Sequence, residues 1–256
     1  MSLIHYTTAD HIAEILIDNP PVNALTEQLL DDYLAALHQA SQDDDVRAVI
    51  VSSAVPGRFC AGLDLKAIHE GQAHVPELLE RLYRQLTDAQ YALNKPSIAA
   101  VNGTARGGGM TMSISCDVII ASDDSTFGYP EIDAGVLPSI HFGHLPKIVG
   151  KHRAFELLFS GRSFGPDEAK ELGLVSHVVP AAELMAQARE LAGVFSSKPR
   201  DVMRLGRQAF KAGSDPQYRA SISAAVDNFC HVASLPDAKE GFAAFAQKRK
   251  PKWNAS

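Results

Sequence analysis

Apolar residues follow two different periods along the first half of the chain. Short, mostly apolar runs predict buried strands. Between these runs, apolar side chains recur every three or four residues, which predicts amphipathic helices beginning near Thr26 and Pro76. Strands that alternate with helices indicate an α/β fold. The four strand-like runs are residues 12–17, 48–51, 97–101 and 118–121.

Beyond residue 150 the pattern becomes mainly helical. Pro166 opens a short predicted helix, residues 175–179 form a last predicted strand, and mostly helix is expected from Ala181 onward. The sequence has no internal repeat and no linker-like segment. We therefore predict an α/β core over residues 1–195 and a helical C-terminal region over residues 196–256.

Amino-acid composition argues against several classes of function. The 256 residues are 46% hydrophobic and 21% charged, as in ordinary globular proteins, and no apolar run approaches the ~20 residues of a membrane span. The net charge of −6 provides no basic surface for nucleic acid. Three cysteines without CxxC spacing argue against a zinc site, and the N-terminus lacks the pattern of a signal peptide. We expect a cytoplasmic protein that binds neither metal, membrane nor nucleic acid.

Two glycine-containing loops are the candidate sites of chemistry. Residues 102–110 (NGTARGGGM) join a strand to a predicted helix that begins near Met110. Three consecutive glycines let a ligand approach the backbone at a helix N-terminus, or they allow a tight turn against another chain segment. Residues 59–65 (FCAGLDL) either expose a backbone amide or form a turn into a helix capped by Asp64. Neither loop matches a dinucleotide or P-loop motif.

These loops belong to an ordered set of motifs that resembles the crotonase family, also called the enoyl-CoA hydratase/isomerase superfamily. The resemblance covers nearly the whole chain. Each motif alone is weak, but their order is specific. The motifs are 19–25 (NPPVNAL), 59–64 (FCAGLD), 99–103 (AAVNG), 107–109 (GGG), 116–117 (CD), 127–131 (FGYPE), 161–164 (GRSF), 167–169 (DEA), 172–175 (LGLV) and 245–250 (FAQKRK).

The resemblance implies a fold and a chemistry. The family fold is a spiral of ββα units with a C-terminal helical region that mediates trimers, often paired into hexamers. Its members process acyl-CoA thioesters, so coenzyme A is part of the substrate and no further cofactor is expected. The thioester carbonyl would lie between two backbone N–H groups, which match Ala61 and Gly108 here. Such donors stabilise the oxyanion of a thioester enolate.

The resemblance also suggests where coenzyme A would bind. Leu63, Asp64 and Leu65 match the family's loop beside the adenine. The basic C-terminal stretch 248–253 would approach the coenzyme A of a neighbouring subunit, and Lys248 is its first cation. A cation and an aromatic ring suit phosphate and adenine, although a solvated C-terminal run explains the same residues.

The acid/base residue is predicted to be Glu131. Family hydratases use two glutamates, and Thr111 stands at the position of the other one. A hydroxyl holds water or substrate but is a poor general base near neutral pH. A single carboxylate can still move a proton from one carbon to another, which favours isomerisation of 3-enoyl-CoA to 2-enoyl-CoA.

Two alternatives remain open. In the first, the protein is an enoyl-CoA hydratase or another acyl-CoA lyase, and Thr111, Ser139 or His141 helps Glu131 to manage water. His144 lies in the same segment, although such histidines are more often packed or solvated. In the second, the protein is a coenzyme A-binding or RNA-associated relative with little catalysis, against which the acidic net charge and the retained Glu131 argue.

Overall fold

The computed structural model describes residues 2–214 and 216–253, and its strands form three sheets within these residues. The largest has the order β1-β2-β4-β7-β9-β12, the second has the order β11-β10-β8-β5, and β3 pairs with β6. The strands are β1 (Ile4–Ala9), β2 (Ile12–Ile17), β3 (Ala24–Leu25), β4 (Ala48–Ser53), β5 (Gly57–Cys60), β6 (Gly62–Leu63), β7 (Ser97–Val101), β8 (Gly103–Arg106), β9 (Val118–Ser122), β10 (Thr126–Gly128), β11 (Ser163–Phe164) and β12 (His177–Val179).

Successive strand pairs build the two larger sheets together. The pairs β4–β5, β7–β8 and β9–β10 each place their first strand in the six-stranded sheet and their second strand in the four-stranded sheet. Neighbours from different pairs are parallel, whereas β1–β2 and β10–β11 are antiparallel. The spiral of ββα units expected from the sequence is therefore present. It brings the segments that follow β5, β8 and β10 to one region of the molecule.

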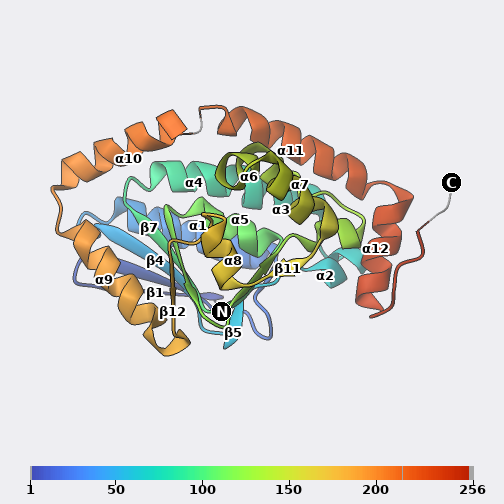
Figure 1. Cartoon of the computed structure of the whole chain (residues 1–256), viewed down its shortest axis with the longest axis horizontal. Helices are drawn as coiled ribbons and strands as arrows, with labels where there is room; N and C mark the ends of the chain where they lie inside the picture. The colour runs from blue at the N-terminus through green and yellow to red at the C-terminus, as the bar shows by residue number, and fades with distance from the viewer. Residues whose placement is uncertain (1, 215, 254–256) are drawn as a thin grey trace.

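The helices surround these sheets, and α10 and α11 extend along one long side of the molecule while α12 lies at one end (Figure 1). Their bounds are α1 (Glu27–Gln42), α2 (Leu65–His69), α3 (Val75–Leu79), the π-helix η1 (Glu80–Gln85), α4 (Leu86–Ala92), α5 (Gly108–Ser115), the 3-10 helix η2 (Pro130–Ala134), α6 (His141–Val149), α7 (Lys151–Ser160), α8 (Pro166–Glu171), the 3-10 helix η3 (Ala181–Glu183), α9 (Leu184–Ser196), α10 (Arg200–Ser214), α11 (Tyr218–Ala233) and α12 (Pro236–Ala246).

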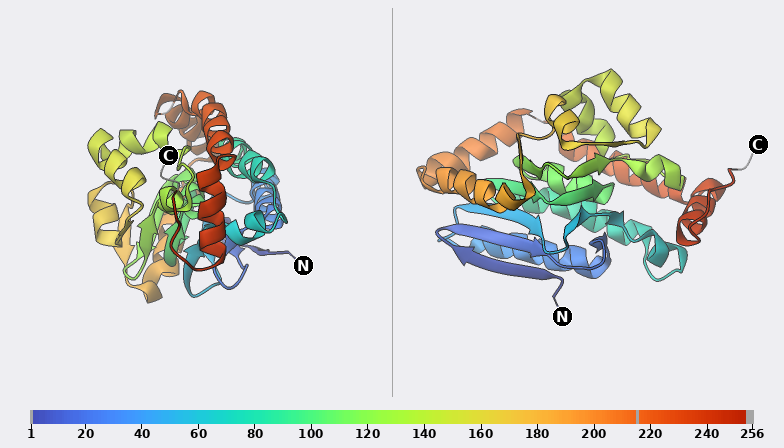
Figure 2. Two further views of the ribbon diagram at one scale, coloured as in Figure 1. Left: turned by 90° about the vertical axis from the view of Figure 1, so that its right-hand side faces the viewer. Right: turned by 60° about the horizontal axis from the view of Figure 1, so that its bottom comes forward.

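Alternation along the buried strands supplies apolar side chains to both faces of the six-stranded sheet. Val49 and Val51 belong to the main core, whereas Ile50 belongs to a second cluster that includes Ala188 and Ala192 of α9. The C-terminal helices also contact the core, because α11 packs against α6 and α12 packs against α2 and η2. Figure 2 shows α12 beside the α2 segment at one end of the molecule.

The predicted strands at 12–17, 48–51, 97–101 and 118–121 are confirmed, and Thr26 caps α1 by accepting a hydrogen bond from the Leu29 N–H. The amphipathic helix expected near Pro76 differs from the prediction, because a π-helix interrupts it and divides it into α3, η1 and α4. The apolar stripe nevertheless continues across it, because Leu79, Leu82 and Leu86 are all buried.

Candidate active site

The glycine triplet forms the N-terminus of α5, directly after β8. Gly107 adopts a φ of +50°, and its N–H donates to the Gly128 carbonyl at 3.2 Å. Helix α5 begins at Gly108, two residues before the position expected from the sequence. The first amides of a helix have no acceptor within the helix, so the Gly108 N–H is a backbone donor at the positive end of the helix dipole. Both features suit a developing negative charge.

Close packing explains why the triplet must be glycine. A Cβ on Gly109 would lie 2.3 Å from the Cys60 carbonyl oxygen, and a Cβ on Gly108 would lie 2.6 Å from Leu25 Cδ1. Both distances are shorter than real Cβ contacts, so the α5 backbone packs directly against the last residue of β5 and against the Leu25 side chain of β3. Close packing against another chain segment, one of the two interpretations of the glycine loop, is therefore confirmed. The same residues allow tight backbone packing and present an amide donor.

The second loop differs from the prediction in the amide that it presents. The Ala61 N–H donates to the Val22 carbonyl at 3.1 Å and is already satisfied. The Asp64 N–H donates to the Leu25 carbonyl at 3.1 Å, on the β3 side of β6. Successive N–H groups of a strand point to opposite sides, so the Leu63 N–H faces away from β3. Leu63, and not Ala61, is the residue of this loop with a donor directed away from the ladder.

Gly62 brings this loop next to the helix terminus. It adopts a φ of +90°, and a Cβ at this position would lie 3.2 Å from the backbone nitrogen of Gly108 and 3.0 Å from the Arg106 carbonyl oxygen. Only a residue without a side chain permits this approach. The backbone of residues 62–63 and the Gly108 amide therefore meet at one place.

Glu131 lies against the other side of the glycine loop. It is in η2, which Pro130 opens, and β10 is tied to Gly107 through the Gly128 carbonyl. A Cβ on Gly107 would lie 3.2 Å from Glu131 Oε1, and Oε2 is buried without a hydrogen-bond partner. Burial raises the pKa of Glu131 to about 7. Both protonation states of the carboxyl group are therefore populated near neutral pH, which is what a group that accepts and returns a proton requires.

Tyr129 forms part of the same site and was not predicted from the sequence, although it lies within the FGYPE motif. The residue is fully buried and its hydroxyl has no hydrogen-bond partner. Burial, and then the nearby Glu131 carboxylate, raise the pKa of this hydroxyl. Its ring packs against the His141 ring with 4.6 Å between centroids. Tyr129 therefore contacts the imidazole and lies near the carboxylate.

Thr111, His141 and His144 form a chain of polar contacts between α5 and α6. Thr111 Oγ1 lies 3.4 Å from His141 Nε2, and His141 Nδ1 lies 3.3 Å from His144 Nε2. His141 is fully buried, and burial followed by the neighbouring His144 lowers its pKa well below the ordinary value, against an opposing hydrogen bond with the Gly107 backbone. His141 is therefore a neutral imidazole. Gly107 thus has the Glu131 carboxylate and the His141 ring as neighbours.

The comparisons with known proteins decide the family. The model of the enoyl-CoA hydratase/isomerase family matches residues 7–256. The chain belongs to the enoyl-CoA hydratase/isomerase family. It is thus an acyl-CoA enzyme with the crotonase fold, as the motifs indicated.

Individual relatives agree with this membership. The chain is 36% identical to a carnitinyl-CoA dehydratase of Proteus mirabilis, over 98% of this chain and 97% of the relative. It is 33% identical to a probable enoyl-CoA hydratase of Bacillus subtilis, over 99% of both chains. A crystal structure of an enoyl-CoA hydratase from Mycobacterium avium subsp. paratuberculosis superposes with a TM-score of 0.88 at 25% identity, over 98% of both chains.

Within this enoyl-CoA hydratase/isomerase family member, Ser139 and Asp64 have structural contacts. The Ser139 hydroxyl donates to the Ala225 carbonyl of α11 at 2.8 Å, so it is engaged away from Thr111. Asp64 caps α2 by accepting from the Ala67 N–H at 3.0 Å, as the turn interpretation of this loop expected. Leu65 is the first residue of α2, and Lys248 is exposed just beyond α12. Because α12 packs against α2, these residues lie at the same end of the molecule.

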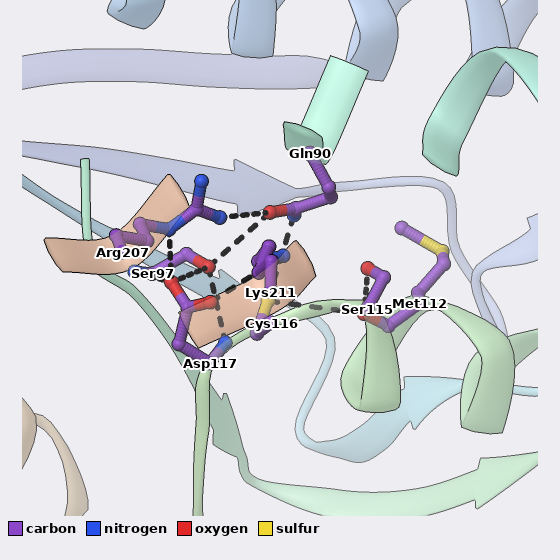
Figure 3. A network of polar contacts seen from close by, with 8 residues as sticks. All are labelled: Gln90, Ser97, Met112, Ser115, Cys116, Asp117, Arg207 and Lys211. Atoms are coloured by element: carbon purple, nitrogen blue, oxygen red, sulfur yellow. Dashed lines mark hydrogen bonds and ion pairs between the residues drawn. The ribbon is translucent and has the colours of Figure 1, made fainter. Parts of the chain in front are cut away.

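The far end of α5 carries a different polar cluster, which Figure 3 shows. Asp117 accepts from Arg207 Nε at 2.7 Å and from the Ser97 N–H at 2.8 Å, and Lys211 Nζ lies 3.4 Å away. Burial raises the pKa of Asp117, but the two cations and the hydrogen bonds outweigh burial and lower it below its ordinary value. The CD motif at 116–117 thus attaches α10 to the α/β core.

Two further features concern residues 2–214 and 216–253. No group of three or more histidine, cysteine, aspartate or glutamate side chains with a geometry suited to a metal ion is found in that part of the chain. No helix of the same residues is long and apolar enough to cross a membrane.

Proposed function

We propose that the protein catalyses the reversible addition of water to the double bond of a 2-enoyl-CoA thioester. The observation that carries the proposal is the contact of Thr111 with His141, which lies beside Gly107 together with the Glu131 carboxylate. Hydration needs one group that takes a proton from water and another that gives a proton to carbon. The site supplies one imidazole and one carboxyl group for these two tasks.

The backbone provides the electrostatic part of the mechanism. Attack of water at C3 of the enoyl thioester places negative charge on the thioester oxygen. In our proposal this oxygen accepts hydrogen bonds from the amides of Gly108 and Leu63. A preorganised donor of this kind lowers the barrier by about 3 kcal/mol. The reaction then needs no cofactor other than the coenzyme A that belongs to the substrate.

The two acid/base groups have complementary states near neutral pH. Glu131, with a pKa of about 7, is available in its protonated form to deliver a proton to C2. His141 is neutral, so its Nε2 can accept a proton from a water molecule, either directly or through the Thr111 hydroxyl. In the dehydration direction each group performs the opposite task. The names of the relatives, a dehydratase and a probable hydratase, support this assignment.

Isomerisation of 3-enoyl-CoA to 2-enoyl-CoA is the second candidate. It is favoured by Thr111 at the position of the second family glutamate, because Glu131 alone can remove a proton from C2 and return it to C4. This reaction would require neither His141 nor a bound water molecule. The two candidates therefore differ in their dependence on the imidazole.

The test compares Glu131→Gln and His141→Gln with wild type on 2-enoyl-CoA and 3-enoyl-CoA in heavy water, with products followed by mass. His152→Gln on the exposed surface of α7 is the matched control. Hydration predicts that both site variants lose roughly 10²- to 10⁴-fold in rate, as expected for loss of an acid/base group. If 3-enoyl-CoA is isomerised and only Glu131→Gln abolishes turnover, the isomerase assignment replaces the hydratase.

The proposal also includes a binding side for coenzyme A and an oligomeric state. We assign Leu63, Asp64, Leu65 and Lys248 to the coenzyme A-binding side, supported by their common position at the α2–α12 end of the molecule.

A homotrimer or a homohexamer is supported by the amphipathic helix α10. Its apolar side chains are exposed, namely Val202 at 66%, Leu205 at 53% and Phe210 at 73%. Light scattering after size-exclusion chromatography measures the oligomeric state directly.

A further inference from the structure

Glu131 lies on η2, a single short turn of 3-10 helix. The Gly135 N–H donates to the Ile132 carbonyl at 3.1 Å, and the Val136 N–H donates to the Glu131 carbonyl at 3.0 Å. A 3-10 turn has poorer hydrogen-bond geometry than an α-helix, so such a turn has little stability of its own. The place of the Glu131 carboxyl group therefore depends on the elements that pack against η2.

Two glycines bring η2 into direct contact with the C-terminal helix α12. A Cβ on Gly241 of α12 would overlap the carbonyl group of Ala134 in η2. From the other side, a Cβ on Gly135 would lie 2.6 Å from the Asp237 carbonyl oxygen of α12. The atoms met on both sides belong to the main chain, which cannot rotate away as the end of a side chain can. The two glycines therefore set how closely η2 and α12 approach.

Helix α12 also contacts the other half of the site. It packs against α2, which begins at Leu65, two residues after Leu63 (Figure 2). The proposed oxyanion donor of the second loop and the acid/base carboxyl group thus lie on segments that border the same helix. A change in the spacing of α12 and η2 would alter the distance between them.

We propose that Gly241 and Gly135 are positioning residues, through which α12 holds Glu131 at a fixed distance from the backbone donors of Leu63 and Gly108. The proposal rests on the proposed function, because the placement of Glu131 affects the rate only if Glu131 transfers a proton. The two glycines act through Glu131 and need no contact with the substrate.

The packing around Glu131 determines what a looser contact would do. Oε1 already lies against Gly107, where a Cβ would be 3.2 Å away, so η2 has no room to move inward. A methyl group added between η2 and α12 therefore opens the packing around the carboxyl group by roughly 1 Å. Because burial is what raises the pKa of Glu131, access of water lowers this pKa towards its ordinary value.

The variants Gly241→Ala and Gly135→Ala approach the contact from its two sides, and each has a matched control. Gly193→Ala is the control for Gly241→Ala, since Gly193 is also helical and its Cβ would meet no heavy atom within 4 Å. Gly173→Ala is the control for Gly135→Ala. Gly173 has a φ of +78° beside +75° for Gly135, and its Cβ would likewise meet nothing within 4 Å. The controls separate backbone strain from loss of the contact.

The first measurement does not depend on any reaction. Carbon-13 NMR follows the titration of the Glu131 carboxyl group, whose signal is assigned by its disappearance in Glu131→Gln. We expect the titration midpoint to fall by about one pH unit in Gly241→Ala and Gly135→Ala and to stay unchanged in both controls. For hydration, kcat should fall roughly 10- to 10²-fold in the two variants while KM stays within about threefold of wild type.

Hydrogen exchange in the wild-type protein tests the same contact without a substitution, so the test does not require that the variants fold. If α12 holds η2, the Val136 N–H should be protected from exchange to within about tenfold of the interior amides of α12. Exchange of Val136 more than about 10²-fold faster, while α12 stays protected, would overturn the proposal.

The failure of this proposal differs from the failure of the proposed function. A folded Gly241→Ala with the wild-type Glu131 titration and kcat would overturn the positioning role, even if Glu131→Gln abolishes hydration. A lowered titration midpoint in a protein that turns over without Glu131 would retain the control of η2 by α12 and refute the proposed function.

Discussion

Replacing Gly109 by alanine tests whether the spacing of the two glycine-containing loops controls catalysis. The added Cβ would lie 2.3 Å from the Cys60 carbonyl oxygen and 3.0 Å from its carbonyl carbon, so it meets backbone and not a flexible side-chain end. Restoring an ordinary van der Waals separation requires the two segments to move apart by roughly 1 Å. Gly109 has a helical backbone, so alanine adds no conformational strain of its own.

The expected effect on catalysis exceeds the effect on stability. Overpacking of this kind costs about 1–3 kcal/mol of folding free energy, partly offset by the better helix propensity of alanine. A displacement of about 1 Å at a reaction site lowers the rate roughly 10²-fold, and complete loss of an oxyanion donor lowers it up to about 10³-fold. We expect Gly109→Ala to fold and to have a kcat about 10²- to 10³-fold below wild type.

The assay is the loss of absorbance of the conjugated thioester on hydration, measured beside thermal unfolding by circular dichroism. Gly193→Ala in α9 is the matched control, because its Cβ would meet no heavy atom within 4 Å. This control should retain its activity and gain up to about 1 kcal/mol of stability. Activity of Gly109→Ala within threefold of wild type, in a folded protein, would refute the claim that the loop contact sets the position of the donors.

Two further predictions concern stability. Burial raises the pKa of Glu131 from its ordinary 4.5 to about 7. Between these two values the folded state binds a proton that the unfolded state releases. The contribution of this residue to stability is therefore complete below pH 4.5 and is lost as the pH rises towards 7. In denaturant unfolding, Glu131→Gln should therefore be more stable than wild type at pH 8, by up to roughly 3 kcal/mol, and the difference should vanish at pH 4. An equal difference in unfolding free energy at pH 4 and at pH 8 would contradict the burial argument. Arg207→Met should lower the unfolding free energy by about 2 kcal/mol, because Asp117 stays buried with Lys211 as its remaining cation. Arg204→Met, which breaks an exposed ion pair, should cost less than about 1 kcal/mol in the same experiment, and equal losses would show that burial of the Asp117 pair contributes nothing.

The longer elements of the fold were predictable because they repeat a pattern over enough residues. The six-residue strand β4 begins with a continuous apolar run, and the sixteen-residue helix α1 repeats apolar residues every three or four positions. Strands β3, β6 and β11 have two residues each, which is too short for any period to show. These short strands nevertheless set the register of the loops at the site. Local pattern therefore predicts the scaffold better than it predicts the positions of the donors.

The candidate site shows the same limit at individual residues. The motif identified the loop at 59–64, but the direction of each N–H depends on the pairing of β6 with β3. This pairing makes Leu63, and not Ala61, the candidate backbone donor. Glu131 was predicted from the FGYPE motif, whereas the burial of its carboxyl group and its proximity to Gly107 appear only in the folded structure. Thr111 and His141 are 30 residues apart, so their contact arises only when α6 packs beside α5.

The proposed oxyanion donors belong to the main chain, and this has a consequence for how the site can be mapped experimentally. Every amino acid except proline carries a backbone N–H, so a complete library of substitutions leaves the Gly108 and Leu63 amides in place at almost every member. Deep mutational scanning would thus record the neighbours that hold these groups and miss the groups themselves. Replacing a single amide by an ester through protein semisynthesis removes one donor and retains the side chain. The contribution of one peptide bond to catalysis can then be measured directly.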